Sequence, residues 1–208
     1  MVLAVRMNAP LCSSALPMMK RLLVLAVVAT ALSVSGANAA TYHVRPDGMG
    51  EFPTIQAALD AAVNGDEVVL TSGVFRGVGN RELDLHGKAV VLRSEGNDTS
   101  MVVIDCEARG SAFLIHSGET RSTRVEGITV TMGSESESGL GGGAIECVGG
   151  APLFRNCAFH HCDSGHGGVV YALSASPRFE ACRFYDNGIV IPGQGGVFWA
   201  ENGAAPQS

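Results

Sequence analysis

Short alternating runs of hydrophobic and polar residues dominate the chain after residue 40. Two such runs, Ala144–Val148 and Leu153–Phe159, are separated by turn residues. An alternation with a period of two is typical of a half-buried strand. Earlier runs have the same character: Glu67–Leu70, Ala89–Arg93, Met101–Cys106 and Ala112–His116. The pattern therefore predicts many short strands.

The runs recur with a period of about 25 residues. Glycine, proline, phenylalanine and cysteine return at this offset: Gly142-Gly143 with Gly167-Gly168, Pro152 with Pro177, Phe154 with Phe179, Cys157 with Cys182, and Phe159 with Phe184. A further copy starts at Gly195-Gly196, and Val125–Val130 belongs to an earlier one. A unit this short has no room for a helix beside its strands, so it buries its inner face only by stacking on its neighbours. We expect an all-β solenoid, a parallel β-helix of about six coils.

One segment, Thr54–Val63, has a helical pattern instead. Its aliphatic residues share one helical face: Ile55, Ala58, Leu59 and Ala62. Thr54 is a good N-cap, and Asn64-Gly65 is a good stop signal. We expect a short helix that covers the N-terminal end of the solenoid, because an open coil exposes its core and unpaired backbone groups.

The chain resembles the right-handed parallel β-helix proteins of the pectate-lyase-like superfamily. The stretch from Phe52 to Ala62, followed by Gly65-Asp66, is similar to their opening of a cap and a first strand. Gly143-Ala144-Ile145, Pro152 and Asn156-Cys157-Ala158-Phe159 are similar to the repeat of exported β-helix proteins. The resemblance covers about residues 41–208 and implies the fold more than an activity, because one fold hosts many functions.

The first 39 residues read as an N-terminal extension and a signal peptide. Lys20-Arg21 precedes the apolar run Leu22–Leu32, and Ala37-Asn38-Ala39 fits a cleavage site of small residues. Met18 or Met19 is a better initiator than Met1. The apolar run is too short to span a membrane. We therefore expect a secreted or periplasmic protein, with a first strand and cap helix over residues 40–65 and the β-helix over residues 66–208.

The charge of the chain excludes one class of partner. The whole chain has a net charge of −6, and without residues 1–40 it has 11 basic against 20 acidic residues, a net charge of −9. An acidic protein repels phosphate backbones, so we expect no nucleic acid as partner.

The alternation assigns Phe154, Cys157 and Phe159 to the inner face, with Cys157 beside Cys182. For these cysteines three readings stay open: buried thiols, a disulfide, or a zinc site that also uses His160, His161 and Cys162. The five cysteines after residue 40 are an odd number, so one thiol has no intramolecular partner: Cys106, Cys147, Cys157, Cys162 and Cys182.

Two columns are expected on the outer face. Glu126, Arg155 and Glu180 form an alternating charge ladder. Glu146, Tyr171 and Trp199 form the second column, and its aromatic rings offer an apolar platform on which sugar rings lie. The alternative is a groove packed under a loop. We take Tyr171, Trp199 and Glu146 as candidate carbohydrate-binding residues and a polysaccharide as the candidate ligand.

The chain lacks the motifs that the resemblance would require for catalysis. The Gln-Asp-Thr and Leu-Gly-Arg-Pro-Trp motifs of pectinesterases are absent, and Gly165-His166-Gly167 lacks the partner motifs of polygalacturonases. Asp105, Glu107 and Arg109 read as turn residues, and Ser134–Ser138 reads as an acidic insertion with calcium binding as its alternative. We assign no catalytic residue, metal or cofactor. We expect a non-catalytic exported β-helix, with a polysaccharide lyase, hydrolase or esterase as the alternative.

The last repeat stops at Pro206-Gln207-Ser208, where its predecessors begin a new strand. A solenoid that ends within a coil leaves its last ladder unpaired. Two readings follow: a fragment of a longer secreted protein, or self-association or another partner at the open C-terminal coil.

Overall fold

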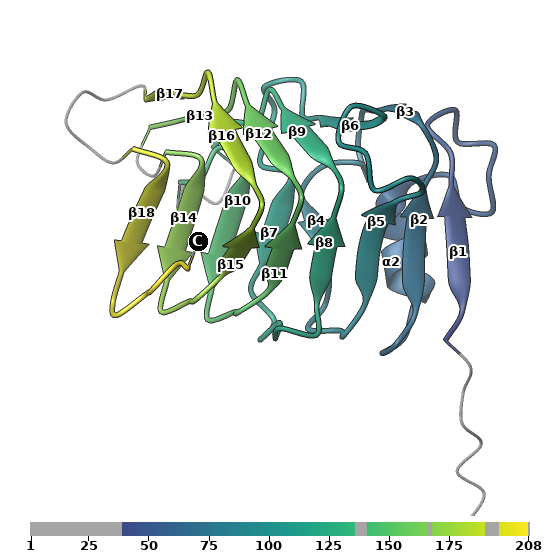
Figure 1. Cartoon of the computed structure of the whole chain (residues 1–208), viewed down its shortest axis with the longest axis horizontal. Helices are drawn as coiled ribbons and strands as arrows, with labels where there is room; N and C mark the ends of the chain where they lie inside the picture. Colours follow the sequence, from purple (N-terminus) through teal and green to yellow (C-terminus); the bar gives the residue numbers. More distant parts are fainter. Residues whose placement is uncertain (1–38, 136–140, 166–167, 190–195, 208) are drawn as a thin grey trace, which may run out of the picture. The chain divides into compact units, whose positions relative to one another are not determined.

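Three parallel β-sheets wind around one core in the computed structural model of the chain, which describes residues 39–135, 141–165, 168–189 and 196–207. Each turn adds one strand to each sheet, and every pairing between neighbouring strands is parallel (Figure 1). The described residues form a β-solenoid of about five turns, where the sequence predicted about six. The predicted signal peptide lies outside the described residues.

Sheet A contains one more strand than the other two large sheets, because the chain enters the solenoid through β1. Its strands, in the order in which they pair, are β1 (Thr41–Val44), β2 (Glu67–Leu70), β5 (Val91–Ser94), β8 (Arg124–Glu126), β11 (Leu153–Arg155) and β15 (Arg178–Glu180).

Sheets B and C each contain five strands within the described ranges. Sheet B consists of β3 (Gly73–Phe75), β6 (Val102–Asp105), β9 (Thr129–Thr131), β12 (Ala158–His160) and β16 (Arg183–Tyr185). Sheet C consists of β4 (Leu83–Asp84), β7 (Phe113–Ile115), β10 (Ile145–Val148), β14 (Val170–Leu173) and β18 (Phe198–Glu201). A small further sheet pairs β13 (Asp163–Ser164) with β17 (Gly188–Ile189).

A single residue turns the chain from sheet A into sheet B. In successive coils this residue is Gly127, Asn156 and Ala181, with φ of 68°, 48° and 52°. The left-handed conformation bends the strand, and glycine and asparagine adopt it most readily. The predicted strand Leu153–Phe159 is therefore wrong as one element, because the bend at Asn156 divides it into β11 and β12.

The bend also explains which side chains reach the core. Phe154 and Cys157 are an odd number of residues apart and would lie on opposite faces of a straight strand. The bend at Asn156 brings both inside, where each is at most 1% exposed. The inward assignment of Phe154, Cys157 and Phe159 is confirmed.

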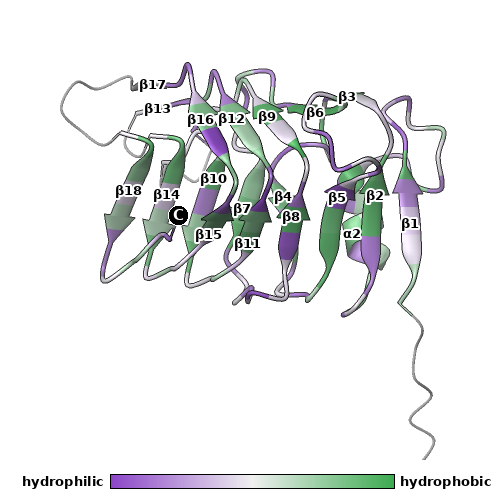
Figure 2. Ribbon diagram, in the orientation of Figure 1, coloured by the Kyte–Doolittle hydropathy of each residue, from purple (hydrophilic) through white to green (hydrophobic). Residues whose placement is uncertain are grey.

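Aromatic rings stack along the solenoid axis inside the core. Phe154 lies over Phe179 with ring centroids 5.2 Å apart, and Phe159 lies over Phe184 at 4.9 Å. Phe113 meets Phe154 edge to face at 5.5 Å. The strands of all three sheets carry hydrophobic residues that feed this core (Figure 2).

The predicted helix forms as α2 (Ile55–Ala61), and it packs against β1, β2 and β4. The hydroxyl of Thr54 accepts a hydrogen bond from the amide of Ala57 at 3.2 Å, as an N-cap does. The side chain of Asn80 accepts from the amide of Ile55 at 2.9 Å, so a second free amide of the first turn is satisfied. Ile55, Ala58 and Leu59 are fully buried.

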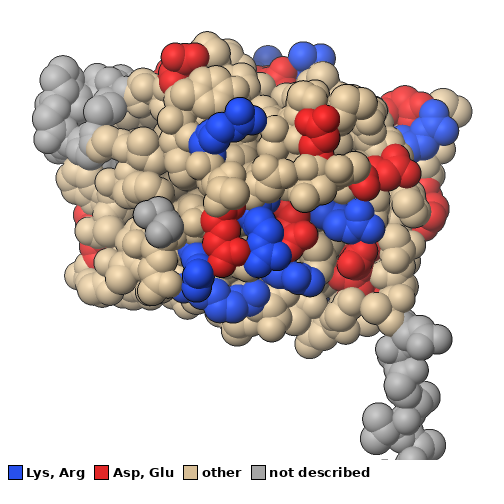
Figure 3. All heavy atoms as spheres, in the orientation of Figure 1, with Lys and Arg blue, Asp and Glu red and all other residues tan. Residues whose placement is uncertain are grey.

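The predicted charge ladder is present on the outer face of sheet A. Arg155 pairs in register with Glu126 on one side and Glu180 on the other, with N–O distances of 3.7 and 2.8 Å. Arg93 and Glu67 continue the alternation at 3.0 Å. Figure 3 shows acidic and basic side chains alternating across this face. Like stacked on like would repel, so the sequence alternates the sign of charge from coil to coil.

We predict that Phe154→Ala lowers the free energy of unfolding by about 3–5 kcal/mol, because it removes a ring that contacts neighbours in three coils and leaves a cavity. Urea unfolding followed by circular dichroism measures the loss. The matched control is Val78→Ala, since Val78 is 85% exposed. A loss no larger than that of the control would contradict the stacked core.

We predict that Arg155→Glu lowers the thermal unfolding midpoint, because two attractive pairs become a column of three like charges. The deficit should shrink at about 1 M salt, where the Debye length is about 3 Å. Differential scanning calorimetry at low and high salt measures it. An unchanged midpoint at low salt would refute a stabilising ladder.

Candidate functional site

One column of side chains runs along the outer face of sheet C through all five strands. The register pairs Asp84 with Leu114, Leu114 with Glu146, Glu146 with Tyr171, and Tyr171 with Trp199. The structure therefore brings the three sequence-predicted residues Glu146, Tyr171 and Trp199 together, and it adds an acidic residue at the far end.

The aromatic part of this column is less open than the sequence suggested. Tyr171 is 6% exposed and Glu146 is 7% exposed, so the expectation of an exposed Tyr171 is wrong. Gly142 passes over the column, and a Cβ added to it would lie 3.1 Å from the Cβ of Tyr171. Burial raises the pKa of the Tyr171 hydroxyl, and the nearby Glu201 carboxylate raises it further. Trp199 remains half-buried.

A single carboxylate orients both aromatic side chains. Trp199 Nε1 donates a hydrogen bond to Glu201 Oε1 at 2.7 Å, and the Tyr171 hydroxyl donates to Glu201 Oε2 at 3.4 Å. Glu201 itself is exposed. This end of sheet C thus combines an indole surface with a carboxylate that faces solvent.

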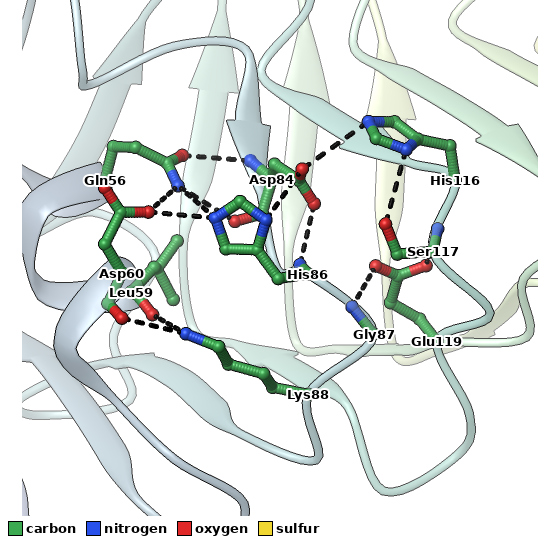
Figure 4. Close-up of polar contacts among 10 residues, drawn as sticks. All are labelled: Gln56, Leu59, Asp60, Asp84, His86, Gly87, Lys88, His116, Ser117 and Glu119. Carbon is green, nitrogen blue, oxygen red and sulfur yellow. Dashed lines mark hydrogen bonds and ion pairs between the residues drawn. The ribbon is translucent and has the colours of Figure 1, made fainter.

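The other end of the column is polar, and sequence reasoning missed it. The imidazole of His86 stands between two carboxylates, with Nε2 2.9 Å from Asp60 Oδ1 and Nδ1 2.9 Å from Asp84 Oδ2 (Figure 4). Both ring nitrogens face acceptors, so only the doubly protonated ring donates to both at once. Asp60 comes from α2 and Asp84 from β4, so the ring joins the helix to sheet C.

Gln56 holds the two carboxylates in place. Its side-chain nitrogen donates to Asp60 Oδ1 at 2.7 Å, and its oxygen accepts from the amide of Asp84 at 2.9 Å. The hydrogen bond from Gln56 lowers the pKa of Asp60, and His86 lowers it further against the opposing effect of burial. The Asp60 carboxylate is therefore maintained in its charged form.

His116 extends the polar group by one coil. Its Nε2 lies 3.6 Å from Asp84 Oδ2, an ion-pair distance rather than a hydrogen bond, and its Nδ1 lies 3.3 Å from the hydroxyl of Ser117. Glu119, only 2% exposed, accepts from the amides of Gly87 and Ser117 at 2.9 and 3.0 Å and fixes both turns. The result is an open chain of hydroxyl, imidazole and carboxylate groups at the surface.

The sequence contains a signal for this polar end that the 25-residue period conceals. Asp84 and Leu114 occupy equivalent positions although they are 30 residues apart, because the early coils have longer turns. Only the register places Asp84 in the same column as Glu146.

The remaining sequence candidates have structural partners. Asp105 pairs with Arg76 at 2.8 Å and Glu107 with Arg81 at 2.9 Å, so these acids stabilise turns. The insertion Ser134–Ser138 and the tripeptide Gly165-His166-Gly167 lie partly outside the described residues.

The cysteine and histidine set divides between two sides of the strand. Cys157 and Cys162 are buried in the core, whereas His160 and His161 lie outside with their Nδ1 atoms 2.6 Å apart. The five cysteines after residue 40 are free thiols, so the structure contains none of the disulfides that the sequence left open. Within the described ranges no group of three or more histidine, cysteine or acidic side chains is arranged to hold a metal ion.

No family model, curated protein or solved structure matches the chain. The parallel solenoid is therefore known from the structure itself. Among the described residues, no helix is long and apolar enough to cross a membrane.

The stacked thiols Cys157 and Cys182 differ in their chemistry. Burial raises the pKa of Cys157, whereas a hydrogen bond from Cys157 lowers the pKa of the half-buried Cys182. Burial also raises the pKa of Cys147 and of Cys162 to about 12. A thiol reacts as its thiolate, so Cys182 is the reactive cysteine of the set.

We predict that Cys182 reacts first with a disulfide reagent in the folded protein and that Cys182→Ser abolishes this phase. The raised pKa values of Cys147 and Cys162 add an alkaline effect. Their contribution to stability is complete below the unfolded thiol pKa of about 8.5 and is lost as pH rises towards about 12. Reagent kinetics and urea midpoints at several pH values measure both effects. Equal reactivity of all five thiols would contradict this assignment.

Proposed function

We propose that this protein is an exported, non-catalytic β-helix that binds a carbohydrate on the outer face of sheet C. The observation that supports it is the continuous column from Asp84 to Trp199, with an indole at one end and carboxylates at both ends. Binding sites combine apolar surface with a few fixed polar groups, and this column contains both.

The chemistry of the column suits a sugar better than other small ligands. A pyranose ring has an apolar face that packs on an indole, and Trp199 is held in one orientation by Glu201. Sugar hydroxyls both donate and accept, and the exposed Asp60, His86 and His116 offer both roles at the other end. Between them Leu114 supplies a further apolar position. An extended glycan could therefore lie across several coils.

We further propose a right-handed coil of the pectate-lyase-like superfamily, closed at its N-terminal end by α2. About 98% of crossovers between parallel strands of one sheet are right-handed, which supports the handedness. The short turn at Asn156 and the repeat of glycine, proline, cysteine and phenylalanine support the superfamily. The signal sequence over residues 1–39 supports export to the periplasm or the cell exterior.

A catalytic alternative is favoured by one arrangement, the His86 imidazole between the Asp60 and Asp84 carboxylates. Carboxylates and imidazoles are the common general acids and bases of enzymes. The alternative is a polysaccharide lyase, hydrolase or esterase with this polar group as its active site.

We predict that affinity electrophoresis in gels containing neutral or uronic-acid polysaccharides retards the protein and that Trp199→Ala weakens binding about tenfold or more. The matched control is Tyr185→Ala, which removes a 45% exposed aromatic ring from sheet B. Equal retardation of Trp199→Ala and the wild type, or no retardation in any gel, contradicts the proposal.

The same polysaccharides also decide between binding and catalysis. Binding without new reducing ends or unsaturated products is the expected result. Product formation that Asp84→Asn abolishes and the exposed-surface control Asp47→Asn retains would establish the catalytic alternative instead.

A further inference from the structure

A second outer row lies on sheet A, away from the sheet C column. The register places Val91, Arg124, Leu153 and Arg178 side by side in successive strands. Apolar and guanidinium side chains alternate along this row. The two arginines are two ladder spacings apart, about 9.5 Å.

A hollow of about 480 Å³ opens beside this row. Ala89, Val91 and Leu153 line it together with Arg121, Ser122 and Arg124. Val91 and Leu153 are each 7% exposed and form its apolar floor. The hollow is thus bounded by two guanidinium groups and a serine hydroxyl.

The local charge is opposite to that of the whole chain. Four arginines gather here, Arg121, Arg124, Arg155 and Arg178, and Glu126 and Glu180 are the acids that pair with them. Figure 3 shows the basic side chains along one edge of this face. A basic patch on a chain of net charge −6 attracts anions to one place.

The two arginines of the hollow differ in how they are held. Arg121 donates to the carbonyl of Pro152 at 3.1 Å and to Gln207 Oε1 at 3.3 Å, so its guanidinium is fixed and keeps further N–H groups for a ligand. Arg124 is 40% exposed and lies 3.6 Å from Glu126 Oε1. Within the described residues its guanidinium makes no hydrogen bond, so its fork is available.

We propose that this hollow is a binding site for a phosphate group. A guanidinium presents a planar fork of donors that matches the oxygens of a phosphate in pairs. A phosphate has oxygens on several sides, so it can accept from Arg121, Arg124 and Ser122 together, whereas a carboxylate offers a single pair of oxygens. The site lies on a different sheet from the proposed carbohydrate column, and neither proposal depends on the other.

Titration with inorganic phosphate, followed by two-dimensional NMR at constant ionic strength, tests the site. We expect saturable shifts of the Val91 and Leu153 methyl signals in the wild type. Arg124→Gln should weaken binding about tenfold or more, since a hydrogen bond to a charged group is lost. The matched control is Arg93→Gln, which removes an arginine of the paired ladder and should bind as the wild type does.

Two further ligands define the chemistry. Glucose 6-phosphate that binds more tightly than inorganic phosphate identifies a phosphorylated sugar as the source, and equal binding identifies free phosphate. Acetate at the same ionic strength should not reproduce the shifts. The proposal is overturned if acetate reproduces them, if Arg124→Gln binds as the wild type does, or if the wild type shows no saturable shift. The methyl shifts of the wild type decide the matter even where a variant does not fold.

Discussion

The parallel ladder between coils is the interaction on which the rest of this structure depends. Each strand pairs in register with the strand one coil away, so every side chain has an equivalent neighbour about 4.8 Å above and below it. Phenylalanines stack well under this rule, and charges do so only with alternating sign. The ladder therefore determines the composition of each column, both in the core and on the surface.

The same rule explains how much could be predicted from the sequence. The spacing of Phe154, Cys157 and Phe159 from Phe179, Cys182 and Phe184 predicted the solenoid, the inner face and the charge ladder, since these coils repeat without insertions. The bend at Asn156 was missed because alternation alone does not reveal one left-handed residue.

The candidate site was only half predictable for a related reason. Glu146, Tyr171 and Trp199 belong to regular coils, so their column could be read from the spacing. Asp84 belongs to an earlier coil with longer turns, and His86 reaches it through Asp60 of the helix. The burial of Tyr171 follows from the chain that passes over it at Gly142, and no local pattern specifies that contact.

The register of sheet C is the central claim, because it assembles the column from residues far apart in the sequence. Nuclear Overhauser spectroscopy of the labelled protein tests it most directly. The structure predicts backbone contacts from Tyr171 to Glu146 on one side and to Trp199 on the other. Contacts from Tyr171 to residues displaced by one position along β10 or β18 would move the alternate side chains to the outer face and contradict the account.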